Sequence, residues 1–257
     1  MESAQEKIVS DHCAAPQKAT GLGSIVSLDS VSTTHSSTSA QDDATVEIAS
    51  ALAADDAHLV SQVTALVNTA YAEAETGIFL PSYRRTSPVE IARFIQQGDL
   101  ALACLGRRLS GASSSVSDSA DQAGGGGRQV IGCVYIKRLS PTLGNFSMLA
   151  LDARFRGGGL GTGLVRFAER HCRELGCTTV QLELLVPTSF AHAVKLRLQA
   201  WYLRMGYRIV RLGSFEQDYP DLVPLLTGPA DFRIFEKDIS SPVTSREAVG
   251  NTFRSAH

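Results

Sequence analysis

The chain has 257 residues, with 24 Lys and Arg against 26 Asp and Glu, so its formal net charge is only −2. This near balance, without a run of Lys or Arg, excludes the electrostatic footprint of a protein that binds nucleic acid or an anionic membrane. No apolar stretch approaches the ~20 residues that span a bilayer, and the N-terminus lacks the charged-then-apolar pattern of a signal peptide. We therefore expect a soluble cytoplasmic protein.

Three segments lack hydrophobic periodicity. Residues 1–43 and 241–257 are rich in small and polar residues, so we expect both ends to be disordered. Residues 109–129 hold a serine cluster and four consecutive glycines between two strand-like runs, which predicts a flexible loop inserted into a hairpin. One folded domain is then expected over residues 44–240. The five cysteines are odd in number and lack zinc spacing, so we expect reduced thiols and no metal.

The predicted elements begin with a strand over residues 45–52. Apolar residues from Val60 to Ala74 then recur at helical spacing and predict an amphipathic helix. The segment Ser87-Pro88-Val89-Glu90 has the pattern of a capping box with proline at the first helical position, so a short second helix should begin there. Residues 100–105 and 130–139 predict antiparallel strands on either side of the insertion.

An apolar strand ending at Leu151 then leads through a glycine-rich stretch, residues 156–162, into an amphipathic helix. Glycines at a strand-to-helix turn let backbone N–H groups approach an anion closely, and the helix dipole favours negative charge there. The stretch therefore predicts an anion-binding loop.

The spacing of the glycines distinguishes between the known types of nucleotide-binding loop. Position 164 would have to be a small residue in the dinucleotide fingerprint and a lysine in the Walker pattern. It is Leu164, so neither pattern fits. The pattern R-x-x-G-x-G is satisfied by Arg156, Gly159 and Gly161. This loop resembles the acetyl-CoA diphosphate loop of the GCN5-related N-acetyltransferase (GNAT) family.

Two further pieces follow in the same order as in that family. Residues 178–186 predict a strand, and a strand, helix and strand in this order form a right-handed crossover with parallel strands. The run from Ala200 to Tyr207 is similar to the family's aromatic-Tyr-x-x-x-Gly-aromatic helix end, and strands over 207–212 and 232–239 close the domain. The resemblance, from about Thr45 to Ile239, implies an α/β fold of the α+β kind. It implies a mixed, mostly antiparallel sheet with a splayed parallel central pair and helices on both faces.

The resemblance also implies acetyl-CoA as co-substrate and transfer of its acetyl group to a primary amine of a small molecule or peptide. The pantetheine arm would enter between the splayed strands and bond their exposed backbone groups. The implied acetyl-CoA-binding residues are Leu149, Leu151, Arg156, Gly157, Gly158, Gly159, Leu160, Gly161 and Thr162.

The resemblance further implies two catalytic residues. Tyr202 occupies the tyrosine of the helix-end motif and would protonate the departing thiolate, unless it only packs in the core. Glu183 lies in a strand motif similar to one whose carboxylate is the base in some family members, although ordered water alone often serves. The long link from Val186 to Ala193 offers His192 as an alternative base.

The acceptor pocket is expected between the segment that joins the first two helices and the loop over residues 213–230. Arg84 and Arg85 could hold a carboxylate or phosphate on the acceptor, or be ordinary surface charges. A non-catalytic acyl-CoA-binding module and a nucleotide-binding domain of another fold are the competing hypotheses, and the acceptor and oligomeric state stay open. The residues expected to form the pocket are Tyr71, Glu75, Phe79, Tyr83, Arg84 and Arg85.

Overall fold

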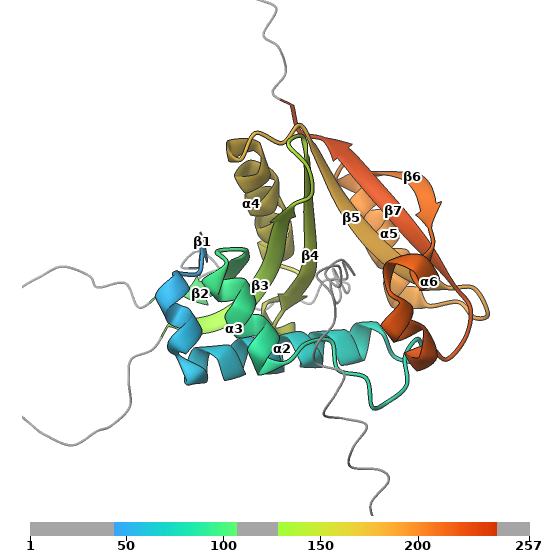
Figure 1. Ribbon diagram of the computed structural model, residues 1–257, viewed down its shortest axis with the longest axis horizontal. Helices are drawn as coiled ribbons and strands as arrows, with labels where there is room; N and C mark the ends of the chain where they lie inside the picture. Colours follow the sequence, from blue (N-terminus) through green and yellow to red (C-terminus); the bar gives the residue numbers. More distant parts are fainter. Residues whose placement is uncertain (1–43, 107–127, 241–257) are drawn as a thin grey trace, which may run out of the picture.

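The computed structural model describes residues 44–106 and 128–240. The ends predicted to be disordered, 1–43 and 241–257, lie outside the described residues, and so does the predicted insertion except for Arg128 and Gln129. The described part forms one sheet covered by helices on two sides (Figure 1).

The sheet has seven strands in the order β1-β2-β3-β4-β5-β7-β6. Neighbouring strands are antiparallel except for β4 and β5, which are parallel. The predicted mixed, mostly antiparallel sheet with a parallel central pair is therefore confirmed. In chain order the strands are β1 (Ala44–Ile48), β2 (Leu100–Leu105), β3 (Gln129–Arg138), β4 (Leu143–Leu151), β5 (Thr179–Pro187), β6 (Arg208–Gly213) and β7 (Ala230–Asp238).

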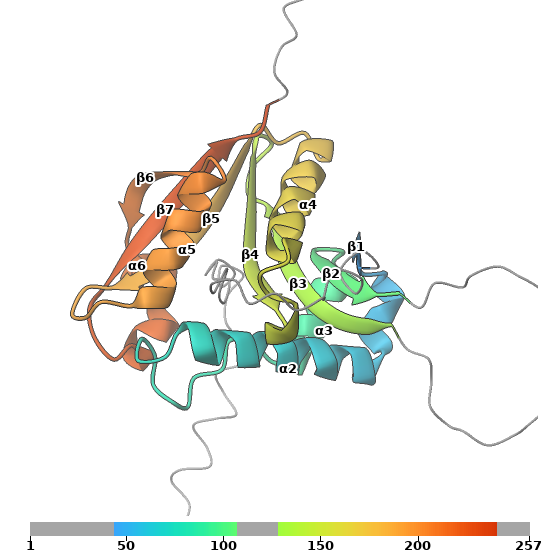
Figure 2. The same ribbon diagram turned by 180° about the vertical axis from the view of Figure 1, so that it is seen from behind.

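Helices cover both faces of the sheet (Figures 1 and 2). The α-helices are α2 (Ala57–Ala74), α3 (Pro88–Gln96), α4 (Leu160–Glu174), α5 (Ala193–Arg204) and α6 (Phe215–Asp218). The short 3-10 helices are η1 (Ala51–Asp55), η2 (Ala153–Phe155) and η3 (Pro220–Leu225). The helices α2 and α3 pack on one face of the sheet, whereas α4 and α5 pack on the other.

The hydrophobic core has one layer on the α4 and α5 face, a second on the α2 and α3 face, and a third cluster around Phe215 and Phe232. Phe146 and Leu149 of β4 join Leu164 of α4 and Tyr202 of α5 in the first layer, and Ala150 faces α2 and α3 in the second. The middle strands are buried on both sides, which explains why they are nearly continuous apolar runs. Each fully buried aliphatic or aromatic side chain stabilises such a core by about 1.5–3 kcal/mol.

Two local expectations are corrected by the structure. The strand predicted over residues 45–52 ends at Ile48. It pairs with β2 in the antiparallel direction, with Ile48 opposite Ala101, and β2 begins at Leu100, so residues after Ile48 have no strand to pair with. The α3 cap is only half of a capping box: the Ser87 hydroxyl accepts from the Glu90 N–H at 3.2 Å. The Glu90 carboxylate instead accepts from the Thr86 hydroxyl at 2.8 Å.

Candidate active site

The central feature of the sheet is a fork between β4 and β5. The two strands pair only at Leu143 with Thr179, Gly144 with Val180, and Asn145 with Gln181. Beyond these positions β4 pairs only with β3 and β5 only with β7, so the strands diverge (Figures 1 and 2). The backbone groups that face the gap have no strand partner across it, which is what an amide-bearing ligand between the strands requires.

The glycine-rich loop lies between the end of β4 and the start of α4, as predicted. Gly157 and Gly159 have positive φ angles of 86° and 87°, and Gly159 is the residue that precedes the helix. Among the described residues no hydrogen bond uses the N–H groups of residues 157–162 as donors; the first helical bond runs from the Gly163 N–H to the Gly159 carbonyl at 2.9 Å. Six consecutive donors at a helix N-terminus form a site suited to a diphosphate.

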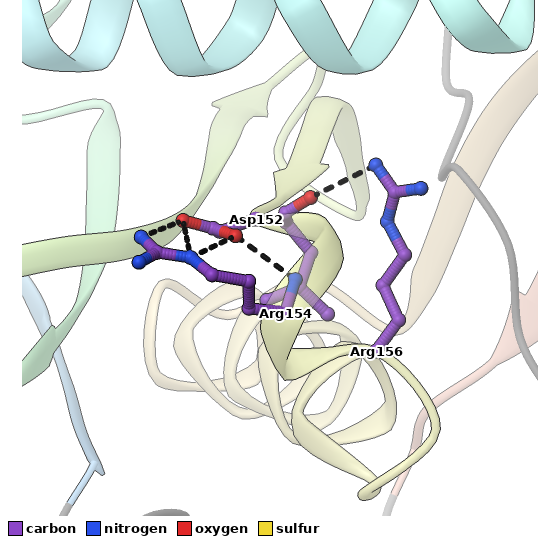
Figure 3. A network of polar contacts seen from close by, with 4 residues as sticks. Asp152, Arg154 and Arg156 are labelled. Carbon is purple, nitrogen blue, oxygen red and sulfur yellow. Dashed lines mark hydrogen bonds and ion pairs between the residues drawn. The ribbon is translucent and has the colours of Figure 1, made fainter.

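The Arg156 side chain turns away from these donors. Its Nη1 lies 2.8 Å from Glu73 Oε2 on α2. Its Nη2 donates to the Leu151 carbonyl at the end of β4 at 3.4 Å (Figure 3). Neighbouring Arg154 forms a separate pair with Asp152. A cavity of about 430 Å³ lies beside them between α2 and the connection from β4 to α4. Arg156 thus ties the loop to α2 through its side chain, and its contact with a diphosphate stays a prediction.

Tyr202 lies on the α4 and α5 face of the fork. Its ring packs 6.2 Å from that of Phe146, the first β4 residue beyond the paired positions, and the residue is fully buried. The Tyr202 hydroxyl has no hydrogen-bond partner within the described part of the chain. Burial raises the pKa of Tyr202 well above its usual value, so the hydroxyl stays protonated at neutral pH.

Glu183 lies on the opposite face of the fork, because residues of β5 alternate and its neighbours Leu182 and Leu184 face α4 and α5. The carboxylate accepts hydrogen bonds from the Tyr219 hydroxyl at 2.6 Å and from Gln181 at 3.2 Å. Burial raises the pKa of Glu183 to about 7, and nearby Asp218 adds to the rise. The hydrogen bonds and the charge of Arg85 oppose it. A carboxylate with this pKa is suited to proton transfer near neutral pH.

Residues 116–207 match the model of the acetyltransferase (GNAT) family. This match confirms the predicted resemblance of this part of the chain to the GNAT family. The GNAT segment, as we call residues 116–207, contains the fork, the glycine-rich loop, Glu183 and Tyr202. It includes none of α2, α3 or the connection between β6 and β7, so the family match says nothing of the acceptor side.

No curated protein matches the sequence. Among the solved structures to which the chain is similar are the following three. Rv2747 from Mycobacterium tuberculosis, in complex with CoA, has 16% identity and a TM-score of 0.46, covering 76% of this chain and 98% of its own. Ard1 from Thermoplasma volcanium has 16% identity and a TM-score of 0.47, with 77% and 99% coverage. The PaiA N-acetyltransferase from Thermoplasma acidophilum, in complex with coenzyme A, has 14% identity and a TM-score of 0.49, with 76% and 98% coverage.

The two segments expected to enclose the acceptor lie side by side next to the GNAT segment. The Leu80 N–H donates to the Leu225 carbonyl at 2.8 Å, and the Thr227 N–H donates to the Ile78 carbonyl at 2.9 Å. The rings of Phe79 and Tyr83 are stacked with centroids 4.2 Å apart. These contacts join the connection between α2 and α3 to the connection between β6 and β7.

The two arginines of this region have different surroundings. Arg84 is exposed, and its Nη1 donates to the carbonyls of Pro81 and Tyr83, both at 2.9 Å. Arg85 is half-buried, and its guanidinium lies 5.1 Å from the centroid of the Tyr71 ring. The sequence left open whether these arginines contact the acceptor or are ordinary surface charges. Arg84 is a surface charge that holds its own loop, whereas Arg85 points inward.

His192 is the N-cap of α5. Its Nδ1 accepts from the Lys195 N–H at 3.4 Å. Burial lowers the pKa of His192, and the Lys195 charge lowers it further. One ring nitrogen is thus committed to the helix end, which favours a structural role over the predicted role as an alternative base.

Sequence reasoning missed a buried ion pair and a set of polar side chains at the fork. Lys195 Nζ lies 2.9 Å from Glu75 Oε1, with both side chains buried, so the pair joins α5 to α2. Asn145 and Ser147 are also buried, and their side-chain polar atoms have no hydrogen-bond partner among the described residues. The sequence offered one signal for the ion pair: Lys195 lies at helical spacing from Leu198 and Tyr202, on the apolar face of α5. No local pattern indicates that Asn145 and Ser147 would be buried without partners.

The described residues contain no group of three or more His, Cys, Asp or Glu side chains placed to hold a metal ion. Cys104, Cys133, Cys172 and Cys177 are buried free thiols, and Cys13 lies outside the described residues. None of the helices in residues 44–106 and 128–240 is long and apolar enough to cross a membrane.

Proposed function

We propose that this protein is an acetyl-CoA-dependent N-acetyltransferase that acts on a primary amine of a small molecule or peptide. The observation that carries the proposal is the pair of groups on the two faces of the fork. The Tyr202 hydroxyl is buried without a partner on one face, and Glu183 has a raised pKa on the other. The coarser assignment, an acetyltransferase, is supported by the family of the GNAT segment.

The main chain supplies the fit for acetyl-CoA. The N–H groups of residues 157–162 would hold its diphosphate, and a Cβ atom added at Gly159 would meet nothing within 4 Å, so the loop is open beside these donors. Leu149, on β4 beyond the fork, has main-chain groups for the pantetheine amides, whereas the Leu151 carbonyl is already used by Arg156. When bound, acetyl-CoA supplies an acetyl group activated as a thioester.

The proposed roles of the side chains follow from their protonation. Above a pH of about 7 Glu183 is mainly a carboxylate, and it takes a proton from the acceptor nitrogen, directly or through water. The Tyr202 hydroxyl donates a proton to the departing sulfur, because a thiol such as that of cysteine, with a reference pKa of about 8.5, is mainly protonated at neutral pH. Tyr219 holds the Glu183 carboxylate in place through its 2.6 Å hydrogen bond.

The test compares the intact protein with Tyr202→Phe in an assay of thiol release from acetyl-CoA against a panel of amines. We expect kcat to fall by about 10²–10⁴-fold in the variant while the Kd for acetyl-CoA changes little. Tyr207→Phe is the matched control, because it also removes one hydroxyl from the same core, where Tyr207 donates to Glu169 at 2.8 Å. Acetyl-CoA binding without turnover on any amine would identify a non-catalytic binding module instead.

A further inference from the structure

Two buried polar side chains lie on the α2 and α3 face of the fork. Asn145 and Ser147 are each 1% exposed, and they flank Phe146 of β4, whose ring lies on the other face. Residues of a strand alternate between its faces, so both side chains lie on the same side of the sheet as Glu183. In the parallel register Asn145 is opposite Gln181, and the Gln181 amide donates to Glu183 at 3.2 Å.

The proposed chemistry does not use the hydrogen-bonding groups of these two side chains. Both amide atoms of Asn145 and the Ser147 hydroxyl lack a hydrogen-bond partner within residues 44–106 and 128–240. A buried polar group without a hydrogen bond destabilises the folded state, and native structures contain few of them. Such groups, gathered where β4 and β5 separate and beside the proposed base, indicate a binding site for a polar part of the acceptor.

The kinds of atoms at this site restrict what can bind there. The Asn145 nitrogen donates and its oxygen accepts, and the Ser147 hydroxyl can do both. An amine alone cannot satisfy them, because its lone pair is needed for the attack on the thioester and it has no oxygen to accept from the Asn145 nitrogen. A carboxylate alone has no N–H to donate to the Asn145 oxygen. An amide has both a carbonyl and an N–H, so it can form two hydrogen bonds with the Asn145 side chain at once.

Two cations beside the expected acceptor pocket already have partners. Lys195 Nζ lies 2.9 Å from the Glu75 carboxylate. Arg85 has a hydrogen bond with the Tyr83 hydroxyl. The carboxylates of Glu75 and Glu90 add their charges to the surroundings of Arg85. Both cations are therefore balanced without an anion from the acceptor.

The charges next to Asn145 are mainly negative. On β3, Lys137 is opposite Asn145, and its charge acts on the nearby Asp99 carboxylate. Glu236 of β7 lies at the same level of the sheet as Asn145, because both are opposite the same residue of β5. An anionic group on the acceptor would be repelled by Glu236 and by the Glu183 carboxylate, whereas a neutral amide would not.

We infer that the acceptor carries an amide next to its amine, as the N-terminal residue of a peptide does, and that Asn145 and Ser147 bind this amide beside Glu183. This inference rests on the proposed function and specifies the substrate class of the same site. The proposed base suits such an amine. The α-amino group of a peptide has a reference pKa of about 7.7–8.0, close to the pKa of about 7 of Glu183, whereas the amine of a lysine side chain has a reference pKa of about 10.4.

The first experiment varies the group beside the amine together with Asn145. Several amino acids are each offered as the amide, as a dipeptide, as the free acid, as the amino alcohol and as the decarboxylated amine. We expect the amides and dipeptides to have the highest kcat/KM. Asn145→Leu keeps a side chain of similar size without donors or acceptors, so it should raise the KM of amides and dipeptides by about 10- to 100-fold. The KM of the decarboxylated amines should change little.

The second experiment tests the hydroxyl, and it keeps the inference falsifiable if Asn145→Leu prevents folding. Ser147→Ala removes one oxygen atom and should raise the KM of the amides by about 3- to 10-fold without changing the Kd for acetyl-CoA. Thr64→Val is the matched control, because it removes a buried hydroxyl that already donates to the Val60 carbonyl at 2.7 Å, and it should leave every KM unchanged. An unchanged KM for the amides in Ser147→Ala would overturn the inferred binding role.

The substrate class and the acetyltransferase activity can be overturned separately. If the free acids, amino alcohols or decarboxylated amines were used as well as the amides, or if Asn145→Leu affected all acceptors equally, the amide inference would fail and the acetyltransferase proposal would stand. Binding of acetyl-CoA without turnover of any amine would overturn the proposed function and the inferred acceptor with it.

Discussion

The two faces of the fork offer a ligand different kinds of groups. On the α4 and α5 side the donors belong to the main chain, namely the N–H groups of residues 157–162 and the unpaired groups of β4. On the α2 and α3 side the polar groups are side chains that come from separate parts of the chain, such as Arg85, Asn145, Glu183 and Tyr219. The first side depends on backbone conformation and the second on residue identity.

The two faces should differ in their response to substitution. Main-chain donors tolerate most changes of side chain as long as the φ angles at Gly157 and Gly159 can be kept. Buried side chains that hold a charge or a proton tolerate almost none, because each loses its partner when one group is removed. Acetyl-CoA affinity and acceptor turnover should therefore respond to different variants.

The largest expected effect is at Glu183. Glu183→Gln keeps the size of the side chain and removes its ability to accept a proton, so we expect kcat/KM for the acceptor to fall by about 10²–10⁴-fold. Affinity for acetyl-CoA should change little, because Glu183 lies on the other face of the fork from Tyr202 and α4. Steady-state kinetics and calorimetry measure the two quantities separately.

The pH dependence sharpens this prediction. The carboxylate fraction of Glu183 grows as the pH rises through its pKa of about 7, so activity of the intact protein should rise over that range. The acceptor amine also loses a proton with rising pH, and Glu183→Gln should retain only that contribution. If the variant kept the same profile and rate, water rather than Glu183 would be the base.

The next effect concerns the ion pair that joins α2 to α5. Lys195→Met leaves the buried Glu75 carboxylate without its partner, and breaking such a pair by removing one member costs about 3–5 kcal/mol. The double variant Glu75→Leu/Lys195→Met removes both charges, so it should recover most of the free energy of unfolding in urea. A double variant as unstable as the single one would show that the pair itself, rather than the unpaired charge, sets the stability.

A smaller effect is expected at the glycine-rich loop. Gly159 has a φ of 87°, and a non-glycine residue in the left-handed region costs roughly 1–2 kcal/mol. Gly159→Ala should therefore weaken acetyl-CoA binding by about tenfold. Gly163→Ala is the matched control. Gly163 lies inside α4 with open space around its Cα, so alanine at this position should stabilise the helix. Equal affinity in both variants would argue against a diphosphate at residues 157–162.

The same contrast explains what the sequence could predict. The glycine-rich loop and the α4 helix follow from residues that are neighbours in the chain, so their position was predictable from local patterns. The end of β1 at Ile48 depends on where β2 begins, and the inward turn of Arg85 but not Arg84 depends on Tyr71. The grouping of Asn145 with Gln181 requires the parallel register, which no short motif encodes.

The smallest expected effect concerns Arg156, which the sequence predicts as an acetyl-CoA ligand and whose side chain contacts α2. Glu73→Gln removes the charge that faces Arg156, but Glu73 is half-exposed, so the change should cost less than about 1 kcal/mol of stability. The Leu151 carbonyl still holds the guanidinium, and we therefore expect the Kd for acetyl-CoA to stay within about twofold. Tighter binding by tenfold or more would mean that Glu73 normally withholds Arg156 from the diphosphate, and the arginine would then belong with the main-chain donors of the loop.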